Sequence, residues 1–387
     1  MSLFNLFKQT KVTEEQSLYP SKSCVFYLEG KGVSCNALVK KDDVVEVGQV
    51  LGKEKEDLSI PVLSSVKGKV LEVKETYNTE GKKVKAIVVE PVDEEANESK
   101  EIDVKSLSTE ELLEMIQGYG LCDENGTPLS IKYRAFSGKK LLIKAFSYEP
   151  NLVAYEILSK KEKEINKALE VLNKLFASLE IKRADDKTVS KKTIELKREE
   201  LIKQFFGQEV KNEEVIVEDL QTIVYLGECF LAGKPHIEEY VVVSGGAVGT
   251  ASLVKVRIGT RLDEIFQSQK GKEENLSKIV LGGALRGKPQ FTSDSAIVNN
   301  TKAVLFLDKK EGSAGTETSC IRCAKCLRAC PEGLNPVKLT ELWARGEKEE
   351  FLKFGGKKCI ECGLCSYVCP SKIEVANKIV TAKAFIK

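Results

Sequence analysis

Apolar and polar positions change their spacing several times along the chain, and each change predicts a different kind of element. Residues 20–95 alternate apolar and polar residues in short runs, which predicts β-strands with turns at an Asp-Asp pair and at Gly68. Residues 158–179 repeat their apolar positions at intervals of three and four, which predicts an amphipathic helix. Short apolar runs return from 237 to 285. The pattern therefore predicts a multidomain protein of the α+β class.

The segment between the two β-rich parts predicts an α/β domain. Ser108 and Glu111 form a capping box that begins one helix, and residues 140–146 predict a central strand. Residues 214–217 should join the same sheet, because alternating strands and helices form such domains. The stripe of the long helix that should face the core consists of Ile165, Leu169, Leu172, Leu175, Phe176 and Leu179.

The first β-rich segment resembles the barrel-sandwich hybrid of biotinyl and lipoyl carriers. A carrier holds its cofactor on a lysine at an exposed hairpin, commonly beside Met or Ala. The connecting stretch 52–59 has lysines without such neighbours, so we expect a structural barrel. The later β-rich segment resembles a β-grasp (SLBB-like) module, in which Gly282-Gly283 is as compatible with a simple turn as with a ligand contact.

Charge and hydropathy narrow the functional class. The chain has 60 Lys and Arg against 58 Asp and Glu, interspersed along its length, which argues against nucleic-acid binding. The first eight residues do not form a secretory signal, and the longest uncharged stretch, 240–254, is shorter than the ~20 apolar residues that cross a bilayer. We expect a cytoplasmic chain. Phe4 and Phe7 could contact a membrane, although such a pair more often packs on its own domain.

Eight of the twelve cysteines form two runs near the C-terminus, each with the spacing C-x2-C-x2-C-x3-C-P. In such a run, three closely spaced cysteines wrap one [4Fe–4S] cubane and the fourth ligates the other cluster. This crossover assigns one ligand set, cluster 1, to Cys320, Cys323, Cys326 and Cys369. The other set, cluster 2, consists of Cys359, Cys362, Cys365 and Cys330.

A pair of zinc knuckles is the alternative interpretation, but knuckles use C-x2-C pairs or mixed Cys/His sets. The connector 335–356 between the runs is predicted to be helical, with Leu339, Leu342 and Trp343 on one face. Clusters of this kind pass one electron at a time near −400 mV, with a wide range about that value. Because four cysteines ligate each cluster and no iron is left open, we expect this domain to transfer electrons without making or breaking bonds. The remaining cysteines are expected to be reduced, partly buried thiols: Cys24, Cys35, Cys122 and Cys229.

We therefore divide the chain into a barrel-sandwich hybrid (1–100), an α/β domain (101–235), a β-grasp module (236–300) and a dicluster ferredoxin domain (301–387). This order resembles the C subunits of Rnf electron transport complexes, membrane machines that exchange electrons between ferredoxin and NAD while moving ions. The resemblance covers nearly the whole chain. The matching stretches are 146–150, 198–203, 233–235, 257–260, 281–283 and both cysteine runs.

The resemblance implies a subunit that lies peripherally on the inner face of the cell membrane. Its partners would be the integral membrane and ferredoxin-like subunits of such a complex, with ferredoxin or NADH as the soluble electron donor or acceptor. The α/β domain would be related to the flavin-bearing subunit of respiratory complex I. In both families that domain binds FMN and NADH through the loop G-x-G-G-x-x-F-P-T, whose glycines let backbone amides approach phosphate.

Here the corresponding stretch, residues 120–132, keeps Gly126 and a Thr-Pro step but places Asp123 and Glu124 where a phosphate would sit. We therefore do not expect FMN and NADH to bind in the manner of the family. Lys132 and Glu149 match positions near the flavin and are interpreted as remnants of that site. His236, the only histidine, is expected in a surface turn.

Three functions remain open at this point. The leading one is an electron-transfer subunit of a membrane-associated, ion-translocating ferredoxin:NAD oxidoreductase of the Rnf type. A soluble flavin-dependent reductase of the cobalamin type resembles the same family and also carries a dicluster domain. The third is a non-catalytic electron adaptor. No catalytic residue is predicted, and whether the chain itself performs NADH or flavin chemistry depends on the rebuilt loop.

Overall fold

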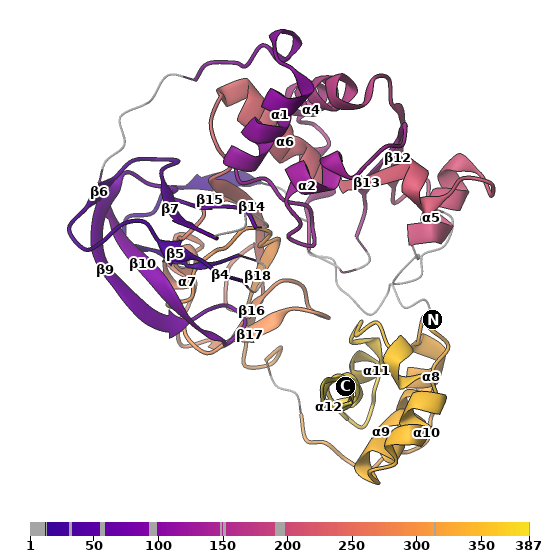
Figure 1. The fold of residues 1–387 in the computed structure, drawn as a ribbon. Helices are drawn as coiled ribbons and strands as arrows, with labels where there is room; N and C mark the ends of the chain where they lie inside the picture. Colours follow the sequence, from indigo (N-terminus) through magenta and orange to yellow (C-terminus); the bar gives the residue numbers. More distant parts are fainter. Residues whose placement is uncertain are drawn as a thin grey trace.

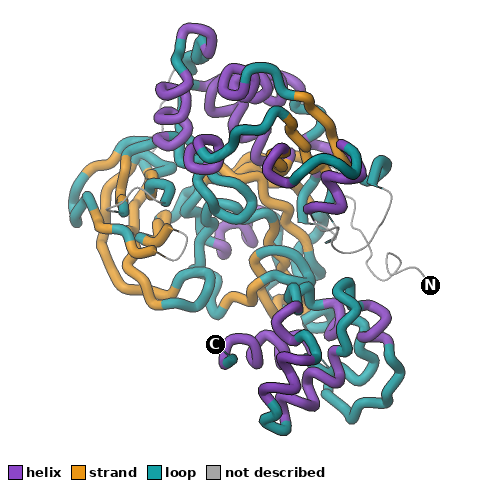
Figure 2. Tube along the Cα trace, turned by 45° about the vertical axis from the view of Figure 1, so that its right-hand side comes forward, coloured by secondary structure: helices purple, strands orange, loops and turns teal. Residues whose placement is uncertain are grey.

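The computed structural model describes residues 12, 14–30, 33–54, 59–92, 99–147, 149, 152–189, 198–312 and 315–386 (Figure 1). The chain forms a large body and a smaller C-terminal lobe (Figure 1). The strands lie in the body, whereas the lobe contains helices and loops (Figure 2). Phe4, Phe7 and residues 55–58 of the connecting stretch lie outside the described residues.

The N-terminal barrel is built from short strands around one apolar core. Strand β10 pairs antiparallel with both β2 and β9, and β7 lies between β5 and β8. Val45, Leu51 and Val70 of the alternating runs are buried in this core, as their spacing predicted. The strands are β2 (Cys24–Tyr27), β3 (Glu29–Gly30), β4 (Val33–Ser34), β5 (Asn36–Ala37), β6 (Val44–Val45), β7 (Val50–Lys53), β8 (Val62–Leu63), β9 (Gly68–Tyr77) and β10 (Lys83–Pro91).

One of the two turns expected in the barrel is confirmed and the other is wrong. Asp42 adopts a left-handed φ of 73° in the predicted Asp-Asp turn. Gly68, however, begins β9 and pairs with both β10 and β6. A Cβ atom at Gly68 would overlap the carbonyl oxygen of Glu90. The glycine therefore permits the close approach of two backbones and does not make a turn.

The α/β domain contains a three-stranded parallel sheet in the order β12-β11-β13. The capping box of Ser108 and Glu111 is confirmed at the start of α1. The elements are η2 (Val104–Ser106), α1 (Thr109–Gly118), α2 (Leu129–Arg134), β11 (Lys140–Ala145), α3 (Tyr155–Leu158), α4 (Glu162–Phe176), β12 (Glu180–Asp185), α5 (Arg198–Phe206), η3 (Asn212–Glu214), β13 (Val215–Asp219) and α6 (Leu220–Ala232).

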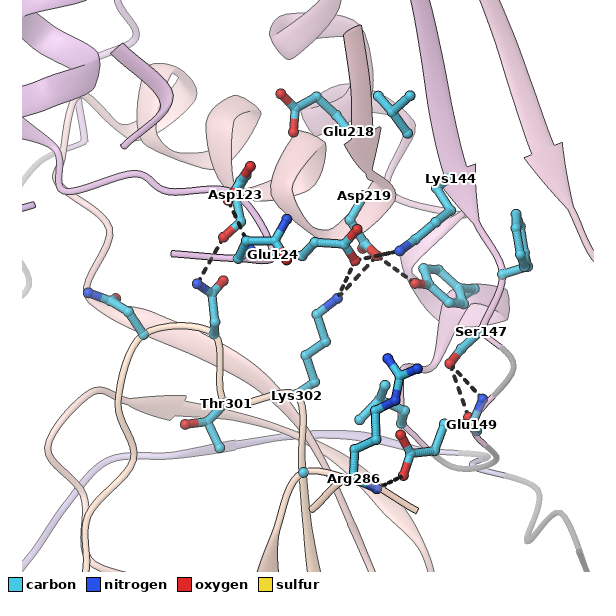
Figure 3. Close-up of a pocket in the computed structure, with 18 of the residues that line it drawn as sticks. Asp123, Glu124, Lys144, Ser147, Glu149, Glu218, Asp219, Arg286, Thr301 and Lys302 are labelled. Carbon is cyan, nitrogen blue, oxygen red and sulfur yellow. Dashed lines mark hydrogen bonds and ion pairs between the residues drawn. The ribbon is translucent and has the colours of Figure 1, made fainter. Parts of the chain in front are cut away.

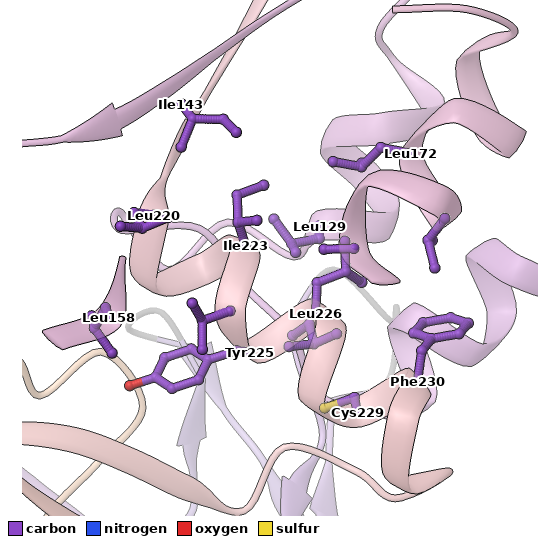
Figure 4. Close-up of a cluster of buried hydrophobic side chains, with 14 of the residues drawn as sticks. Leu129, Ile143, Leu158, Leu172, Leu220, Ile223, Tyr225, Leu226, Cys229 and Phe230 are labelled. Carbon is purple, nitrogen blue, oxygen red and sulfur yellow. The ribbon is translucent and has the colours of Figure 1, made fainter. Parts of the chain in front are cut away.

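The predicted helix 158–179 is shorter than expected, because α3 ends at Leu158 and α4 ends before Ala177, which is left-handed at φ 47°. Its buried stripe includes the predicted Leu172, while the other five predicted positions pack partly buried at the edge of the core. Helix α6 is buried on nearly all sides and fills the centre of this core together with α4 (Figure 4).

The later β-rich segment forms a six-stranded mixed sheet in the order β1-β15-β14-β18-β16-β17. Strands β14 and β15 form an antiparallel hairpin, α7 follows, and β18 inserts parallel to β14 and antiparallel to β16. This arrangement is the predicted β-grasp. Its elements are β1 (Glu15–Leu18), β14 (Glu238–Ser244), β15 (Ser252–Arg257), α7 (Leu262–Ser268), β16 (Leu276–Leu281), β17 (Lys288–Gln290) and β18 (Ala303–Asp308).

Two of the expected domain boundaries are wrong at this sheet. Strand β18 lies beyond residue 300, yet it is the central partner of β14 and β16. Strand β1 comes from the segment assigned to the barrel but pairs with β15 at the sheet edge. Both errors arise because pairing partners in a sheet are set by tertiary contacts between distant segments, which a local pattern does not report.

His236 also differs from expectation, because it is buried. Its Nε2 lies 3.1 Å from Oε1 of Glu239, and its ring packs 4.3 Å from the ring of Tyr225. The residue stands just before β14, and this central strand carries the segment into the interior.

The C-terminal lobe packs short helices around Leu339, Leu342 and Phe351, so the predicted helical connector is confirmed. The helices are α8 (Lys325–Ala329), α9 (Pro336–Ala344), α10 (Lys348–Lys353), η4 (Gly356–Lys358), α11 (Leu364–Tyr367) and α12 (Val375–Phe385). Among the helices of the described residues, none has both the length and the apolar character that a bilayer span requires.

Candidate functional site

The two cysteine runs have the same backbone shape. Arg322 and Ala324 in the first run and Glu361 and Gly363 in the second all have positive φ, between 53° and 76°. These residues stand at the same two places relative to the cysteines of each run. Non-glycine residues rarely adopt this conformation, because it costs roughly 1–2 kcal/mol. The repeated left-handed positions bend each loop around its own centre.

Backbone amides are directed at the sulfurs inside these loops, as expected for an iron–sulfur site. The N–H of Arg322 donates to Sγ of Cys320 at 3.4 Å. In the second run, the N–H groups of Glu361 and Leu364 donate to Cys359 and Cys362.

A void beside the second loop lies between cysteines of both runs. It is lined by Cys359, Cys362 and Cys365 and by Cys330, the fourth cysteine of the first run. Burial raises the pKa of the Cys365 thiol to about 12, and this thiol would be deprotonated by a metal that it ligates. No three His, Cys, Asp or Glu side chains of the described residues converge closely enough for a single metal ion. A [4Fe–4S] cubane does not require such convergence, because each of its four cysteines ligates a different iron.

At the other end of the lobe, two hydrogen bonds bring the segments before Cys320 and after Cys369 together. The N–H of Thr318 donates to the carbonyl of Ser371 at 3.0 Å, and Oγ of Ser371 donates to the carbonyl of Ser319 at 3.0 Å. The four cysteines outside the runs, Cys24, Cys35, Cys122 and Cys229, are buried thiols in the body, and Cys24 and Cys35 share the core of the barrel.

A second candidate site is a pocket of about 710 Å³ between the α/β domain and the β-grasp sheet, called here the interdomain pocket (Figure 3). Its walls come from the 120–132 loop, the ends of β11 and β13, and segments 281–288 and 298–302. Lys132 and Glu149, the two predicted flavin-site residues, both line it. The structure therefore brings these two residues to one cavity.

Opposite charges pair inside this pocket (Figure 3). Glu124 pairs with Lys144 and with Lys302, the latter at 3.4 Å. Asp219 lies 3.2 Å from Nζ of Lys302 and accepts a hydrogen bond of 2.7 Å from the hydroxyl of Tyr155. Burial raises the pKa of Glu124, but the two lysine charges outweigh this effect and lower the pKa to about 2. The lysines therefore have internal carboxylate partners.

Lys132 likewise forms ion pairs with carboxylates of the same pocket. Its Nζ lies 2.9 Å from Oε1 of Glu218 and 3.2 Å from Oδ2 of Asp123. Burial raises the pKa of Glu218 to about 7 against the opposing charge of Lys132. Glu218 is thus a fully buried carboxyl whose proton is lost near neutral pH.

The 120–132 loop is closed by one of its own side chains. Oδ1 of Asp123 accepts hydrogen bonds of 2.9 Å from the amides of Asn125 and Thr127, and its carbonyl accepts one from Gly126. These are the amides that would have to face a phosphate in a glycine-rich loop. Because Asp123 occupies them and Glu124 adds a second negative charge, the residues present do not fit the phosphate of FMN.

Glu149 holds the wall of the pocket that faces the lobe. Its Oε1 accepts the amides of Leu285 and Arg286 at 2.5 and 3.0 Å. A Cβ atom at Gly283 would overlap this carboxylate, so the glycine leaves room for it. The Gly282-Gly283 pair therefore does more than make a turn.

The same wall touches the second cysteine loop. Leu285 packs against Cys362 and Leu364. A Cβ atom added to Gly363 would lie only 2.5 Å from the carbonyl oxygen of Leu285, so the two backbones approach closely. The charge of Arg286 acts on Cys362. Segment 281–288 therefore separates the pocket from the cysteines by a single layer of residues. Sequence reasoning missed Lys144, Asp219, Leu285, Arg286 and Lys302, because no local motif marks any of them.

Comparison with known proteins agrees with the first and last parts of this architecture. The RnfC barrel sandwich hybrid domain family matches residues 6–95, and the 4Fe-4S dicluster domain family matches residues 319–373. The expected barrel-sandwich hybrid and dicluster ferredoxin domains are therefore confirmed, as is the iron–sulfur character of the lobe.

The C subunits of two ferredoxin:NAD⁺ oxidoreductase complexes match most of the chain. The one from the Na⁺-translocating complex of Acetobacterium woodii is 26% identical over 80% of this chain and 78% of its own length. The one from the proton-translocating complex of Clostridium ljungdahlii is 26% identical over 85% of this chain and 79% of its own length. The crystal structure of an NAD⁺-reducing [NiFe]-hydrogenase aligns with 72% of this chain and 61% of its own, at a TM-score of 0.43 and 12% identity.

Proposed function

We propose that this chain, a divergent relative of the C subunits of Rnf-type complexes, is an electron-transfer subunit of a membrane-associated ferredoxin:NAD oxidoreductase of the ion-translocating type. The observation that carries the proposal is the void lined by Cys330 together with the three leading cysteines of the second run. That grouping is the one that crossover ligation by two [4Fe–4S] clusters requires.

In this proposal each run supplies three ligands to one cluster and one ligand to the other. Cys320, Cys323, Cys326 and Cys369 hold cluster 1, and Cys359, Cys362, Cys365 and Cys330 hold cluster 2. When bound, the clusters accept and release single electrons. The chain contributes amide donors to the sulfurs and a protein layer that separates cluster 2 from the pocket.

The charges of the interdomain pocket favour an electron conduit rather than a flavin reductase. Its lysines are paired with Glu124, Asp219 and Glu218, and the loop amides are bound by Asp123. An anionic cofactor would have to break these contacts. Lys132 and Glu149 then have structural roles, and NADH or flavin chemistry would belong to other subunits.

The partners we infer are the integral membrane subunits and a ferredoxin-like subunit of the complex, with ferredoxin or NADH as the soluble donor or acceptor of the whole assembly. The chain would lie peripherally on the inner face of the cell membrane. The names of the relatives, which describe ion-translocating complexes, support this placement.

Anaerobic purification with parallel assays of iron, acid-labile sulfide and released flavin tests the proposal. We expect about eight irons and eight sulfides per chain, as two cubanes require, without stoichiometric flavin. Stoichiometric FMN would favour the cobalamin-type reductase, and an iron content near zero would refute the electron-transfer role. Purification from native membranes should recover integral membrane subunits, whereas a purely soluble, partner-free chain would contradict membership of a complex.

A further inference from the structure

The two cluster sites differ in how the protein covers them. In the second run, Cys362 and Cys365 are buried, and Leu285 from the body packs on the loop. Cys359 of that run is half-buried. In the first run, only Cys326 is buried, Cys323 is half-buried and Cys320 is exposed. Helix α11 of the second run also lies nearer the body than α8 of the first (Figure 1). Cluster 2 therefore faces inward, and the first run is on the free side of the lobe.

The surface around Cys320 combines apolar and basic side chains. Ile321 is 67% exposed and Leu327 is 41% exposed. The residues of this surface, called here the outer face, are Ile321, Arg322, Lys325, Leu327 and Arg328. None of its three cations makes an ion pair with a carboxylate in the described part of the chain. The matching position of Arg322 in the second run is Glu361, which is paired with Lys383.

We propose that the outer face docks an acidic protein electron carrier that exchanges single electrons with cluster 1. The inference rests on the proposed function, because it requires clusters at the cysteine runs. One electron leaves the reduced carrier and reduces oxidised cluster 1, or passes in reverse, and no bond or proton is transferred. Unpaired cations steer an acidic partner, while exposed apolar residues at the centre of the face exclude water on contact.

An anionic membrane is the competing occupant for a basic and apolar surface. Lipid-binding segments usually carry clusters of four to eight Lys or Arg, about 1 kcal/mol each, and the outer face has three. The rate of electron transfer falls steeply with distance. The exposure of Cys320 beside Ile321 would bring a redox centre of the partner close to cluster 1, whereas a lipid has no such centre. The observations therefore favour a protein carrier.

The variant that tests the inference is Arg322→Glu combined with Lys325→Glu. The loop should accept glutamate at position 322, because Glu361 has the same left-handed conformation in the second run, at φ 59°. Arg328 is left unchanged, since it donates to the carbonyl of Cys323 at 3.1 Å. The matched control is Lys357→Glu combined with Lys358→Glu, which makes the same change of charge on exposed residues beside the second run.

Both variants and the native chain are loaded with clusters and mixed, in stopped flow, with a reduced acidic plant-type [2Fe–2S] ferredoxin. We expect the outer-face variant to lower the second-order rate by about tenfold or more at low salt, with a weaker salt dependence, whereas the control stays within about twofold. Reduced methyl viologen, a small cation, should reduce both variants at no lower rate than it reduces the native chain.

Several results would overturn the inference while leaving the proposed function intact. Equal rates in the native chain and the outer-face variant would do so, as would equal slowing in the control. Loss of binding to vesicles of phosphatidylserine and phosphatidylcholine by the outer-face variant, with unchanged ferredoxin rates, would assign the face to lipid. By contrast, failure of the native chain to load iron would remove the proposed function itself.

Discussion

The iron–sulfur lobe and the interdomain pocket are the two candidate sites, and they differ in how much of each site a local sequence motif specifies. Each cysteine run places three cysteines within seven residues, so local spacing alone defines the loop. The pocket is assembled from several distant segments, and its charges meet only after folding. The lobe keeps the complete motif. In the pocket, the positions that would face a cofactor are occupied by ion pairs of the chain itself.

This difference shows how few residues decide what an assembled site can bind. A few residues, chiefly Asp123, Glu124 and Asp219, suffice to bind the loop amides and the lysines internally. The surrounding fold remains, and Glu149 uses its carboxylate to hold the wall against the lobe. In our proposal, this wall supports the position of cluster 2.

The largest expected effect is the loss of a whole cluster. Replacing either Cys326 or Cys365 with serine should lower the iron content from about eight to about four per chain, because we assign the two cysteines to different cubanes. Iron and sulfide assays measure the change. Cys229→Ser is the matched control, since Cys229 is a buried cysteine outside the runs and should leave the iron content unchanged. Full iron in either of the first two variants would refute the ligand sets.

The dicluster domain could be predicted from sequence because its cysteine motif is contiguous, and the helix cap of Ser108 could be predicted for the same reason. The pocket could be predicted only through Lys132 and Glu149. Asp219 and Lys302 are 83 residues apart, and neither belongs to a recognisable motif. Asp219 caps a helix, which is the ordinary role of an aspartate before an apolar run. Its second role, beside Lys302 and Tyr155, depends on the packing of the α/β domain against the β-grasp sheet, which no periodic pattern contains.

The pH dependence of stability should distinguish the pocket from the lobe. Burial raises the pKa of Glu218 to about 7 in the folded chain, above its ordinary 4.5. The folded state therefore binds this proton more tightly, so this carboxyl stabilises the fold at low pH and the contribution is lost as pH rises from about 4.5 to about 7. Glu218→Gln should remove up to about 3 kcal/mol of that decline in the free energy of unfolding.

Urea unfolding followed by circular dichroism between pH 5 and 8 measures this slope. Glu124→Gln is the matched control in the same pocket. The pKa of Glu124 is lowered to about 2, so its contribution is lost only as pH falls below about 4.5. The control should lower stability at every pH tested and change the slope only slightly, because the charge of Glu124 is the smallest of the causes that act on the pKa of Glu218. A native chain whose stability is flat from pH 5 to 7 would contradict the assignment of Glu218.

A smaller effect is expected where the two regions touch. Gly363→Ala places a Cβ atom 2.5 Å from the carbonyl oxygen of Leu285, at a φ of 76°. We expect a loss of roughly 2–3 kcal/mol, from backbone strain and from the displaced contact. The measurement is the temperature at which cluster absorbance is lost. Gly346→Ala shares the backbone conformation, at φ 74°, but has no atom within 4 Å of the added carbon, so it isolates the strain. Equal effects of the two substitutions would mean that the contact with Leu285 contributes nothing.

The smallest effect concerns electron transfer across that contact. Arg286 is exposed and acts on Cys362 through its charge. A positive charge favours the reduced cluster, which carries one more electron, so Arg286→Gln should make the potential of cluster 2 more negative by about 20–60 mV, equivalent to roughly 0.5–1.4 kcal/mol. Redox titration followed by electron paramagnetic resonance measures this shift, and the Cys326→Ser background leaves cluster 2 to be observed alone. Lys288→Gln is the matched control, because it removes one positive charge from the lining of the same pocket. An equal shift in the control would mean that the pocket acts through its total charge, whereas a shift confined to Arg286 would make this residue the electrostatic link between the two regions.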